Sequence, residues 1–278
     1  MRRLALLTAV AMVSVIYVRP QAVTDGRLDG NAHPAVVLLL MEVNNRPAFR
    51  CSATLLSPTI VLTAGHCTSN FPDSPYTGMR VFTESDVEAG IGTTNNYPFA
   101  GPNAVEATSW AAHPLYETGP FFLHDVGVVV LSAPINLPAA QYGRLPQVDQ
   151  FDRLKTRRGQ QDVTFTAVGY GLQESFPDPA LFLATNTRTR MSATPRLIQI
   201  NAPGFTGDFS MLLSNNHSTG GTCFGDSGGP NFYGSGRTET KIVAGVTSFG
   251  LNGNCAGTGG VFRMDRQDVL DFVQSYLP

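Results

Sequence analysis

Residues 220–230 read Gly-Gly-Thr-Cys-Phe-Gly-Asp-Ser-Gly-Gly-Pro, and this stretch decides how the whole chain is interpreted. Glycines crowd around Ser227, which disfavours a helix or a long strand interior and lets backbone N–H groups approach a ligand closely. The core Gly225–Gly229 fits three interpretations: a nucleophile elbow between a strand and a helix, a nucleophile loop between strands, and a surface turn without chemistry. Residues elsewhere in the chain separate these three.

Composition narrows the class of protein. The chain has 278 residues, of which 42% are apolar and 14% charged, as in a folded globular protein with one large or two small domains. The formal net charge is −2, which gives no reason to expect nucleic acid or an anionic membrane as a partner.

Residues 1–22 predict a secretory signal peptide. Two arginines precede an apolar run from Leu4 to Val18, and the small residue Ala22 follows soon after. The alternative is a membrane anchor, but a span needs about 18 or more apolar residues and this run has about 15. We therefore expect a mature chain from Val23 that is secreted, extracellular or periplasmic, and free of the membrane.

The four cysteines agree with an oxidising compartment. They are Cys51, Cys67, Cys223 and Cys255, and they permit three pairings. Short C-x-x-C spacings typical of a metal site are absent. Pairing neighbours in sequence closes two moderate loops, each of which adds about 3 kcal/mol of stability in the chain-entropy model.

Short strands separated by turn residues are predicted along the chain. The 28 glycines and 19 prolines punctuate apolar or alternating segments and favour an all-β fold with sandwich or barrel closure. The clearest candidate strands are residues 36–40, 59–63, 126–131, 163–168 and 242–249. A helix is predicted only at the end, where Val269, Phe272, Val273 and Tyr276 share one helical face.

A histidine next to a cysteine is the candidate base. His66 and Cys67 follow the predicted strand that ends at Thr63, and a disulfide at Cys67 would hold the imidazole rigidly. A serine hydroxyl needs such a base because it is a weak nucleophile at its own pKa. The alternative is a core or metal-binding histidine.

An aspartate at the start of an apolar strand is the candidate third group. Asp125 precedes Val126–Leu131, and a carboxylate there is costly to bury without a partner. Orienting an imidazole would provide that partner. The alternative is an aspartate that caps a turn before the strand.

Chain order separates the interpretations of Ser227. A strand-to-helix nucleophile elbow requires a histidine after the serine. The histidines are His33, His66, His113, His124 and His217, all of which precede it. The order His66, Asp125, Ser227 is that of the chymotrypsin-type triad.

These motifs resemble the trypsin and chymotrypsin-like serine proteases (peptidase family S1) over nearly the whole mature chain. The matching segments are Cys51–Leu56, Thr63–Cys67, His113–Tyr116, Asp125–Val128, Val168–Gly171 and Gly225–Pro230. The resemblance implies a secreted endopeptidase without a cofactor or a metal, acting on polypeptides as a monomer. A catalytically silent homologue that serves as a binding protein is the alternative.

The resemblance also implies roles for individual residues. Ser227 is the nucleophile, His66 the general base, and Asp125 the group that orients the imidazole. The N–H groups of Gly225 and Ser227 form the oxyanion hole. Asp226 pairs with a new α-ammonium group after activation, and Val23 is the candidate for that terminus.

Specificity follows from the primary pocket of the family. Gly221, six residues before Ser227, corresponds to the pocket floor, and its lack of charge argues against a preference for Arg or Lys. Ser248 and Phe249 correspond to the segment that pairs with the substrate backbone. Gly250 and Gly260 correspond to the pocket walls. An apolar or aromatic residue before the cleaved bond is therefore expected.

The implied fold is two six-stranded antiparallel β-barrels with a C-terminal α-helix. We expect residues 23–150 to form the first barrel, with His66 and Asp125. Residues 151–278 should form the second barrel, which carries Ser227 and the pocket, and the terminal helix. The cleft between the barrels is the expected active site.

Overall fold

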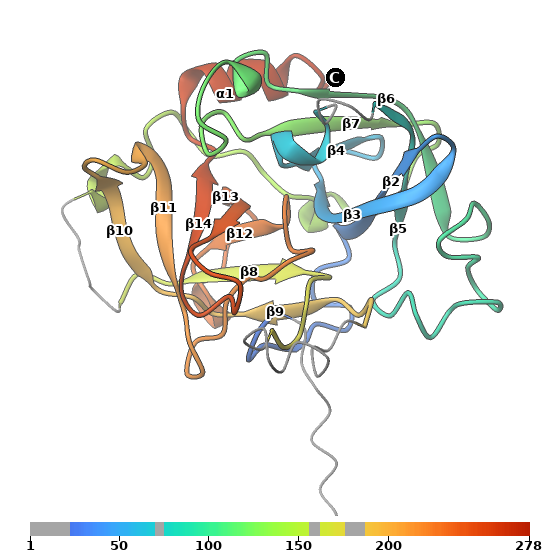
Figure 1. The fold of residues 1–278 in the computed structure, drawn as a ribbon, viewed down its shortest axis with the longest axis horizontal. Helices are drawn as coiled ribbons and strands as arrows, with labels where there is room; N and C mark the ends of the chain where they lie inside the picture. The colour runs from blue at the N-terminus through green and yellow to red at the C-terminus, as the bar shows by residue number, and fades with distance from the viewer. Residues whose placement is uncertain (1–22, 70–74, 156–161, 176–186) are drawn as a thin grey trace, which may run out of the picture.

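The computed structural model describes residues 23–69, 75–155, 162–175 and 187–278. The predicted signal peptide, 1–22, lies outside the described residues. Two antiparallel sheets lie side by side, and the single described α-helix, α1 (Gln267–Gln274), covers one end of them (Figure 1). No helix in the described part of the chain is long and apolar enough to cross a membrane.

The first sheet is a closed barrel with strand order β2-β3-β4-β7-β6-β5. Its strands are β2 (Val36–Val43), β3 (Arg46–Leu55), β4 (Ile60–Thr63), β5 (Tyr76–Phe82), β6 (Ala104–Ala112) and β7 (Gly127–Leu131). Asn44 and Asn45, both with positive φ, form the tight turn between β2 and β3 that suits a twisted hairpin. This barrel matches the predicted one.

Strand β2 is buried on both faces from Val36 to Met41, which explains the unbroken apolar sequence of those residues. Val37 and Leu39 belong to the apolar cluster inside the barrel. The alternate residues Val36 and Leu38 belong to a second cluster with Val168 and other residues of the second sheet. Because side chains alternate across a strand, β2 joins the two halves of the molecule.

The second sheet has eight strands in the order β1-β9-β8-β12-β13-β14-β11-β10, rather than the predicted six-stranded barrel. They are β1 (Arg27–Leu28), β8 (Phe165–Gly169), β9 (Met191–Ala193), β10 (Leu197–Ala202), β11 (Gly207–Asn215), β12 (Pro230–Tyr233), β13 (Val243–Gly250) and β14 (Gly257–Arg263). An isolated bridge between Thr164 and Arg196 links the start of β8 to the start of β10. The sheet is therefore a half-barrel whose curvature brings distant strands together.

The first described residues pair with the second sheet, although we expected residues 23–150 to form the first barrel. Strand β1 pairs with β9, and Thr24 forms a bridge with Gly221. Val23 is fully buried in a small cluster with Met191. Residues 23–28 thus reach the nucleophile stretch in space.

Candidate active site

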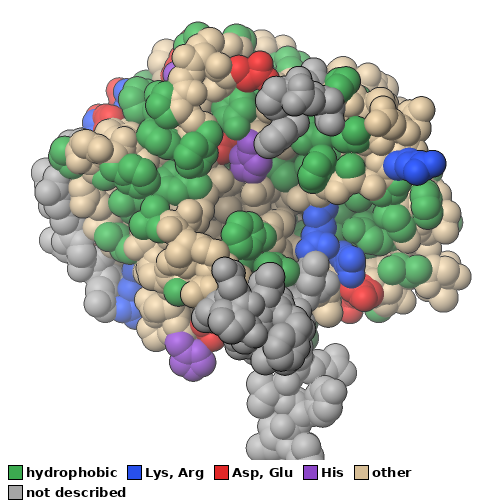
Figure 2. Space-filling model, viewed as in Figure 1, with side chains coloured by type: hydrophobic (Ala, Val, Ile, Leu, Met, Phe, Trp, Pro, Cys, Tyr) green, Lys and Arg blue, Asp and Glu red, His purple; other side chains and the backbone are tan. Residues whose placement is uncertain are grey.

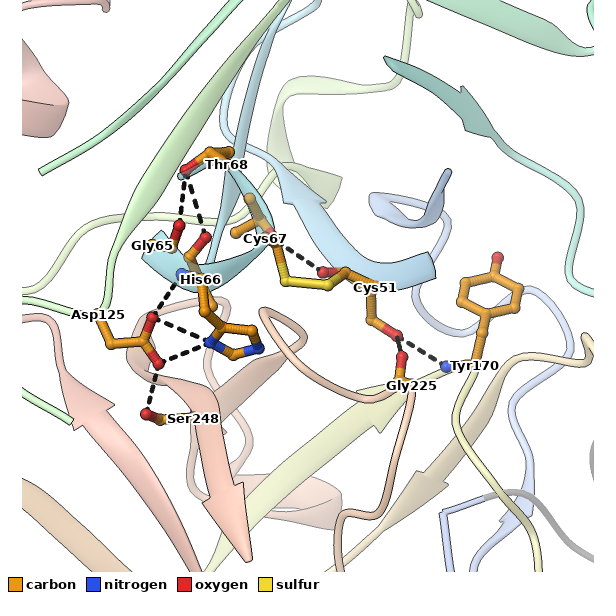
Figure 3. Close-up of a disulfide and its surroundings, with 12 residues drawn as sticks. Cys51, Gly65, His66, Cys67, Thr68, Asp125, Tyr170, Gly225 and Ser248 are labelled. Carbon is orange, nitrogen blue, oxygen red and sulfur yellow. Dashed lines mark hydrogen bonds and ion pairs between the residues drawn. A yellow bond between two sulfur atoms is a disulfide. The ribbon is translucent and has the colours of Figure 1, made fainter. Parts of the chain in front are cut away.

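A disulfide and a short 3₁₀ turn hold His66 at the end of β4. The turn covers Gly65–Cys67, and Cys67 is bonded to Cys51 on β3 (Figure 3). Gly65 is required because a Cβ there would lie 3.1 Å from the backbone nitrogen of Val126. The imidazole is therefore anchored to two strands and to the segment that carries the candidate aspartate.

Asp125 is fully buried and receives hydrogen bonds from three groups. The His66 backbone N–H donates to Oδ1 at 2.9 Å, and Nδ1 of the same residue lies 2.9 Å from Oδ2. The Ser248 hydroxyl donates to Oδ2 from β13 of the second sheet (Figure 3). These donors offset the cost of burying a carboxylate. They also place the imidazole proton on Nδ1, which leaves Nε2 as an acceptor.

The environment of His66 favours the protonated imidazole. Burial alone would lower its pKa, but the negative charge of Asp125 and the bond to that carboxylate raise the pKa above its ordinary value of 6.5. The imidazole can therefore accept a proton at neutral pH more readily than a free histidine.

The nucleophile loop holds Ser227 beside the segment that leads into His66. The Ser227 carbonyl accepts a hydrogen bond from the Ser52 N–H at 2.8 Å. A Cβ at Gly228, whose φ is +75°, would lie 2.7 Å from the Ala64 nitrogen. Within the described residues no hydrogen bond joins the Ser227 hydroxyl to the imidazole; such contacts often tighten only when substrate binds.

Two backbone N–H groups of the loop donate no hydrogen bond within the described residues. The carbonyls of Phe224 and Gly225 accept hydrogen bonds from Leu172 N–H (2.8 Å) and Ser52 Oγ (3.0 Å). Neither Gly225 nor Ser227 donates its own N–H to any described residue. Gly225 has a φ of +95°, a conformation that favours glycine. This arrangement leaves two donors for a developing negative charge.

Asp226 lies fully buried beneath the loop. Its carboxylate accepts hydrogen bonds from the N–H groups of Gly171 (2.8 Å) and Cys223 (2.9 Å). Burial nevertheless raises its pKa to about 7. A Cβ at Gly169 or Gly171 would lie 2.2 or 2.5 Å from this carboxyl group, so both glycines are needed to accommodate it. The second disulfide, Cys223–Cys255, closes the loop on its other side.

The candidate pocket floor is uncharged but polar. The space that a side chain at Gly221 would occupy is filled by Asn215, whose Cγ lies 2.2 Å from the Cβ position. The Asn215 amide donates to the Thr222 carbonyl at 2.8 Å and accepts from the Thr24 hydroxyl at 2.7 Å. Gly250 has only the Asn252 carbonyl within 4 Å of its Cβ position, so this wall is open.

The space beside Gly260 is filled, whereas the sequence-based expectation was a wall that leaves room for a large group. A Cβ at Gly260 would lie 2.1 Å from Cζ of Phe249, so this glycine makes room for the aromatic ring. Gly259 instead pairs with Gly250, and its Cβ position faces Thr222 Oγ1 at 3.3 Å. Because alternate residues of a strand face opposite sides, Gly259 is the better candidate for the wall position.

An exposed aromatic cluster borders the site, and this cluster was not predicted from the sequence. The Phe249 ring contacts those of Phe121 and Phe205 at centroid distances of 5.8 and 5.7 Å. Phe121 is 58% exposed and Phe205 is 44% exposed. The adjacent pair Phe121-Phe122 precedes Asp125 in sequence and was the available signal. The cluster offers apolar surface next to the candidate pocket.

His113 and His124 stack on each other near the helix. Their ring centroids are 4.8 Å apart, and Nδ1 of His124 lies 3.1 Å from Asp268. Nδ1 of His113 accepts a hydrogen bond from the Leu115 N–H, which places the proton on Nε2, towards Asp268. This tautomer suits hydrogen bonding to the carboxylate rather than coordination of a metal ion.

The sequence of this chain is similar to one family model and to several known proteins. The family model described as Trypsin matches residues 27–272. Glandular kallikrein of Sus scrofa is 25% identical over 202 residues, which are 72% of this chain and 75% of that protein. Scolexin B of Heliothis virescens is 39% identical over 75 residues, which are 26% of this chain and only 20% of that protein.

A solved structure of HL collagenase has the same fold. The TM-score is 0.65 and the identity 19%, with 91% of this chain and 97% of that chain covered. At this level of identity the likeness bears on the fold alone.

Proposed function

Because this chain belongs to the trypsin family of serine proteases, we propose that it is an endopeptidase in which Ser227, His66 and Asp125 act as the catalytic triad. The observation that carries the proposal is the buried Asp125 carboxylate, which fixes the proton on Nδ1 of His66. A catalytically silent homologue is not favoured, because all three residues are present and two of them are bonded to each other.

The proposed reaction is acyl transfer in two steps. Nε2 of His66 accepts the hydroxyl proton as Ser227 Oγ attacks the carbonyl carbon, and the carbonyl oxygen becomes an oxyanion. The N–H groups of Gly225 and Ser227 would bind that oxyanion. His66 then donates the proton to the leaving amine, the C–N bond breaks, and an acyl-enzyme remains. Water, deprotonated by the same imidazole, releases the acid and regenerates Ser227.

The pocket supports a preference for a large uncharged residue before the cleaved bond. Its floor holds the Asn215 amide instead of a carboxylate, and the walls at Gly250 and Gly259 lack side chains. An incoming ammonium or guanidinium group would meet this uncharged amide and would lose hydration without gaining a carboxylate from the floor.

We predict that peptides with Phe, Tyr or Leu before the cut are cleaved at least about tenfold faster than matched Arg or Lys peptides. The measurement is kcat/KM over a library that varies only this position. Dominant cleavage after Arg or Lys would overturn the pocket assignment. Failure to cleave any peptide would count against the endopeptidase function itself.

We also propose that the α-ammonium of Val23 pairs with Asp226 after cleavage behind Ala22. Val23 is fully buried, and Thr24 pairs with Gly221 beside the nucleophile loop. A buried carboxylate whose pKa is raised to about 7 needs a cation to remain ionised at neutral pH. The secreted protein should therefore begin at Val23.

This pairing predicts a difference in pH dependence between two forms of the chain. In an N-terminally extended form, the pKa of Asp226 rises from 3.8 unfolded to about 7 folded, so its carboxyl binds more protons when folded. Folding stability is then lost as pH rises through this interval, by about 3 kcal/mol between pH 5 and 8. A form beginning at Val23 should lack that loss. Thermal unfolding of both forms from pH 5 to 8 tests this, and identical profiles would contradict the pairing.

We further propose that the protein is secreted and that it acts as a monomer. Both disulfides require an oxidising compartment to form and persist, which agrees with an extracellular or periplasmic location. Polypeptides are the expected partners, and neither nucleic acid nor membrane is needed for the proposed reaction.

A further inference from the structure

Two arginines form a positively charged edge beside the nucleophile loop. Arg50 lies on β3, immediately before Cys51, and Arg188 lies shortly before β9. A Cβ at Gly225 would be 3.3 Å from Nε and 3.6 Å from Nη2 of Arg50. The guanidinium group therefore faces the side-chain position of Gly225, two residues from the proposed nucleophile.

An open cavity of about 440 Å³ has both arginines on its wall. Most of the remaining wall is apolar, including Leu40, Phe49, Ile91 and Pro98. Phe49 is 51% exposed, and the Arg188 side chain is 30% exposed, so the cavity is accessible from solvent. Basic side chains are also visible beside the hollow on this face of the molecule (Figure 2). A short peptide segment would meet both apolar surface and guanidinium groups here.

Within the described residues, this edge brings together two guanidinium groups, both of which also interact with Tyr97, and one exposed carboxylate. Glu88 is 44% exposed and pairs with Arg188 at 3.2 Å, whereas Asp226 is buried beneath the loop. Burial and the positive charge of Arg188 lower the pKa of the Arg50 guanidinium, and Tyr97 and Asp226 oppose that effect. Burial is the larger cause, and both guanidinium groups stay protonated in proteins, so an incoming carboxylate would meet two positive charges here.

The edge formed by Arg50 and Arg188 lies on the side of the site where the substrate residues after the cleaved bond would bind. Ser248 and Gly225 lie on opposite sides of the His66 imidazole (Figure 3). Ser248 leads into Phe249 and Gly250, beside the pocket proposed for the residue before the cut. The chain after the cut must therefore leave on the other side, over Gly225 and towards Arg50.

We propose that Arg50, together with Arg188, binds an aspartate or glutamate in the first two positions after the cleaved bond. This inference rests on the proposed endopeptidase function and names the substrate class of that same site. Arginine suits the role because its planar guanidinium can pair with a carboxylate through two parallel hydrogen bonds.

Matched peptides test the proposal. They share all residues up to the cut and carry Glu, Gln or Lys in one of the two following positions. We expect kcat/KM for the Glu peptide to exceed that for Gln about tenfold, with Lys slower still. The Glu preference should weaken between about 0.05 and 0.5 M salt, because the Debye length falls. Equal rates for the three peptides would overturn the proposal.

Variants and a second substrate separate this proposal from the endopeptidase function. Arg50→Gln and Arg188→Gln should each reduce the Glu-to-Gln ratio to about threefold or less, whereas Arg50→Lys should retain more of it. Arg46→Gln is the matched control, because Arg46 is an exposed residue at the start of the same strand. Within each variant the ratio is independent of the amount of folded enzyme. A short aminocoumarin amide has no residues after the cut: no hydrolysis of it would refute the endopeptidase function, whereas hydrolysis without a Glu preference refutes only the acidic subsite.

Discussion

Replacing Ser227 with alanine should lower peptide hydrolysis about 10⁶-fold, an effect that only the loss of His66 should match. The hydroxyl is the proposed nucleophile, and no other group can form the acyl-enzyme in its place. The fold should persist, because the contacts that hold the loop use the Ser227 carbonyl and the backbone of Gly228. Steady-state hydrolysis and thermal unfolding should be measured on the same preparation.

Ser132→Ala is the matched control for this substitution. Ser132 is exposed in the turn after β7 and lies outside the proposed site. Its replacement should leave hydrolysis within about twofold of the wild type. A Ser227→Ala protein that still hydrolyses peptides at more than about a hundredth of the wild-type rate would contradict the assignment of the nucleophile.

Replacing Asp125 with asparagine should lower kcat about 10⁴-fold. The carboxamide cannot accept hydrogen bonds as the carboxylate does, so the imidazole loses the tautomer that leaves Nε2 free. The acid limb of the pH profile should also change. In the wild type, activity is lost as pH falls through a His66 pKa above 6.5, because Asp125 stabilises the protonated imidazole. The residual activity of the variant should be lost at lower pH than that of the wild type.

Ser248→Ala provides a milder comparison, because it removes one donor to Asp125 and keeps the carboxylate. It should cost only about tenfold in kcat. Asp271→Asn on the exposed face of α1 is the matched control and should leave both the rate and the pH profile unchanged. An Asp125→Asn enzyme with a wild-type rate and an unshifted acid limb would show that this carboxylate does not orient the base.

Local sequence was sufficient to predict the residues of the proposed triad. Ser227, His66 and Asp125 each lie next to a glycine, a disulfide or an apolar strand that constrains its position strongly. Their chain order excluded the strand-to-helix elbow before any geometry was known. Some strands of the first barrel could be predicted in the same way, such as Val36–Val43, which precedes the turn at Asn44, but the six-stranded barrel itself was expected from the family resemblance.

Features that depend on strand register could not be predicted. Gly259 and Gly260 are indistinguishable in sequence, and an irregularity between Thr247 and Phe249 decides which of them faces the pocket. A shift of one residue moves a side chain to the opposite face of a strand.

Long-range contacts could not be predicted from the sequence alone either. Nothing local indicates that Asn215 fills the space beside Gly221, or that Arg50 faces the side-chain position of Gly225. The short pairing of β1 with β9 joins residues far apart in the chain, and no periodic pattern in the sequence indicates this pairing. These contacts determine the character of the pocket and of the proposed acidic subsite, so specificity was less predictable than the chemistry.

Reaction of the folded mature protein with a fluorophosphonate tests most directly whether Ser227 is an activated nucleophile. Peptide mapping after the reaction should find about one adduct per chain, located on Ser227, and replacement of His66 by alanine should abolish it because the hydroxyl loses its base. An adduct that is absent from Ser227, or that forms there equally fast without His66, would contradict the proposed catalytic mechanism.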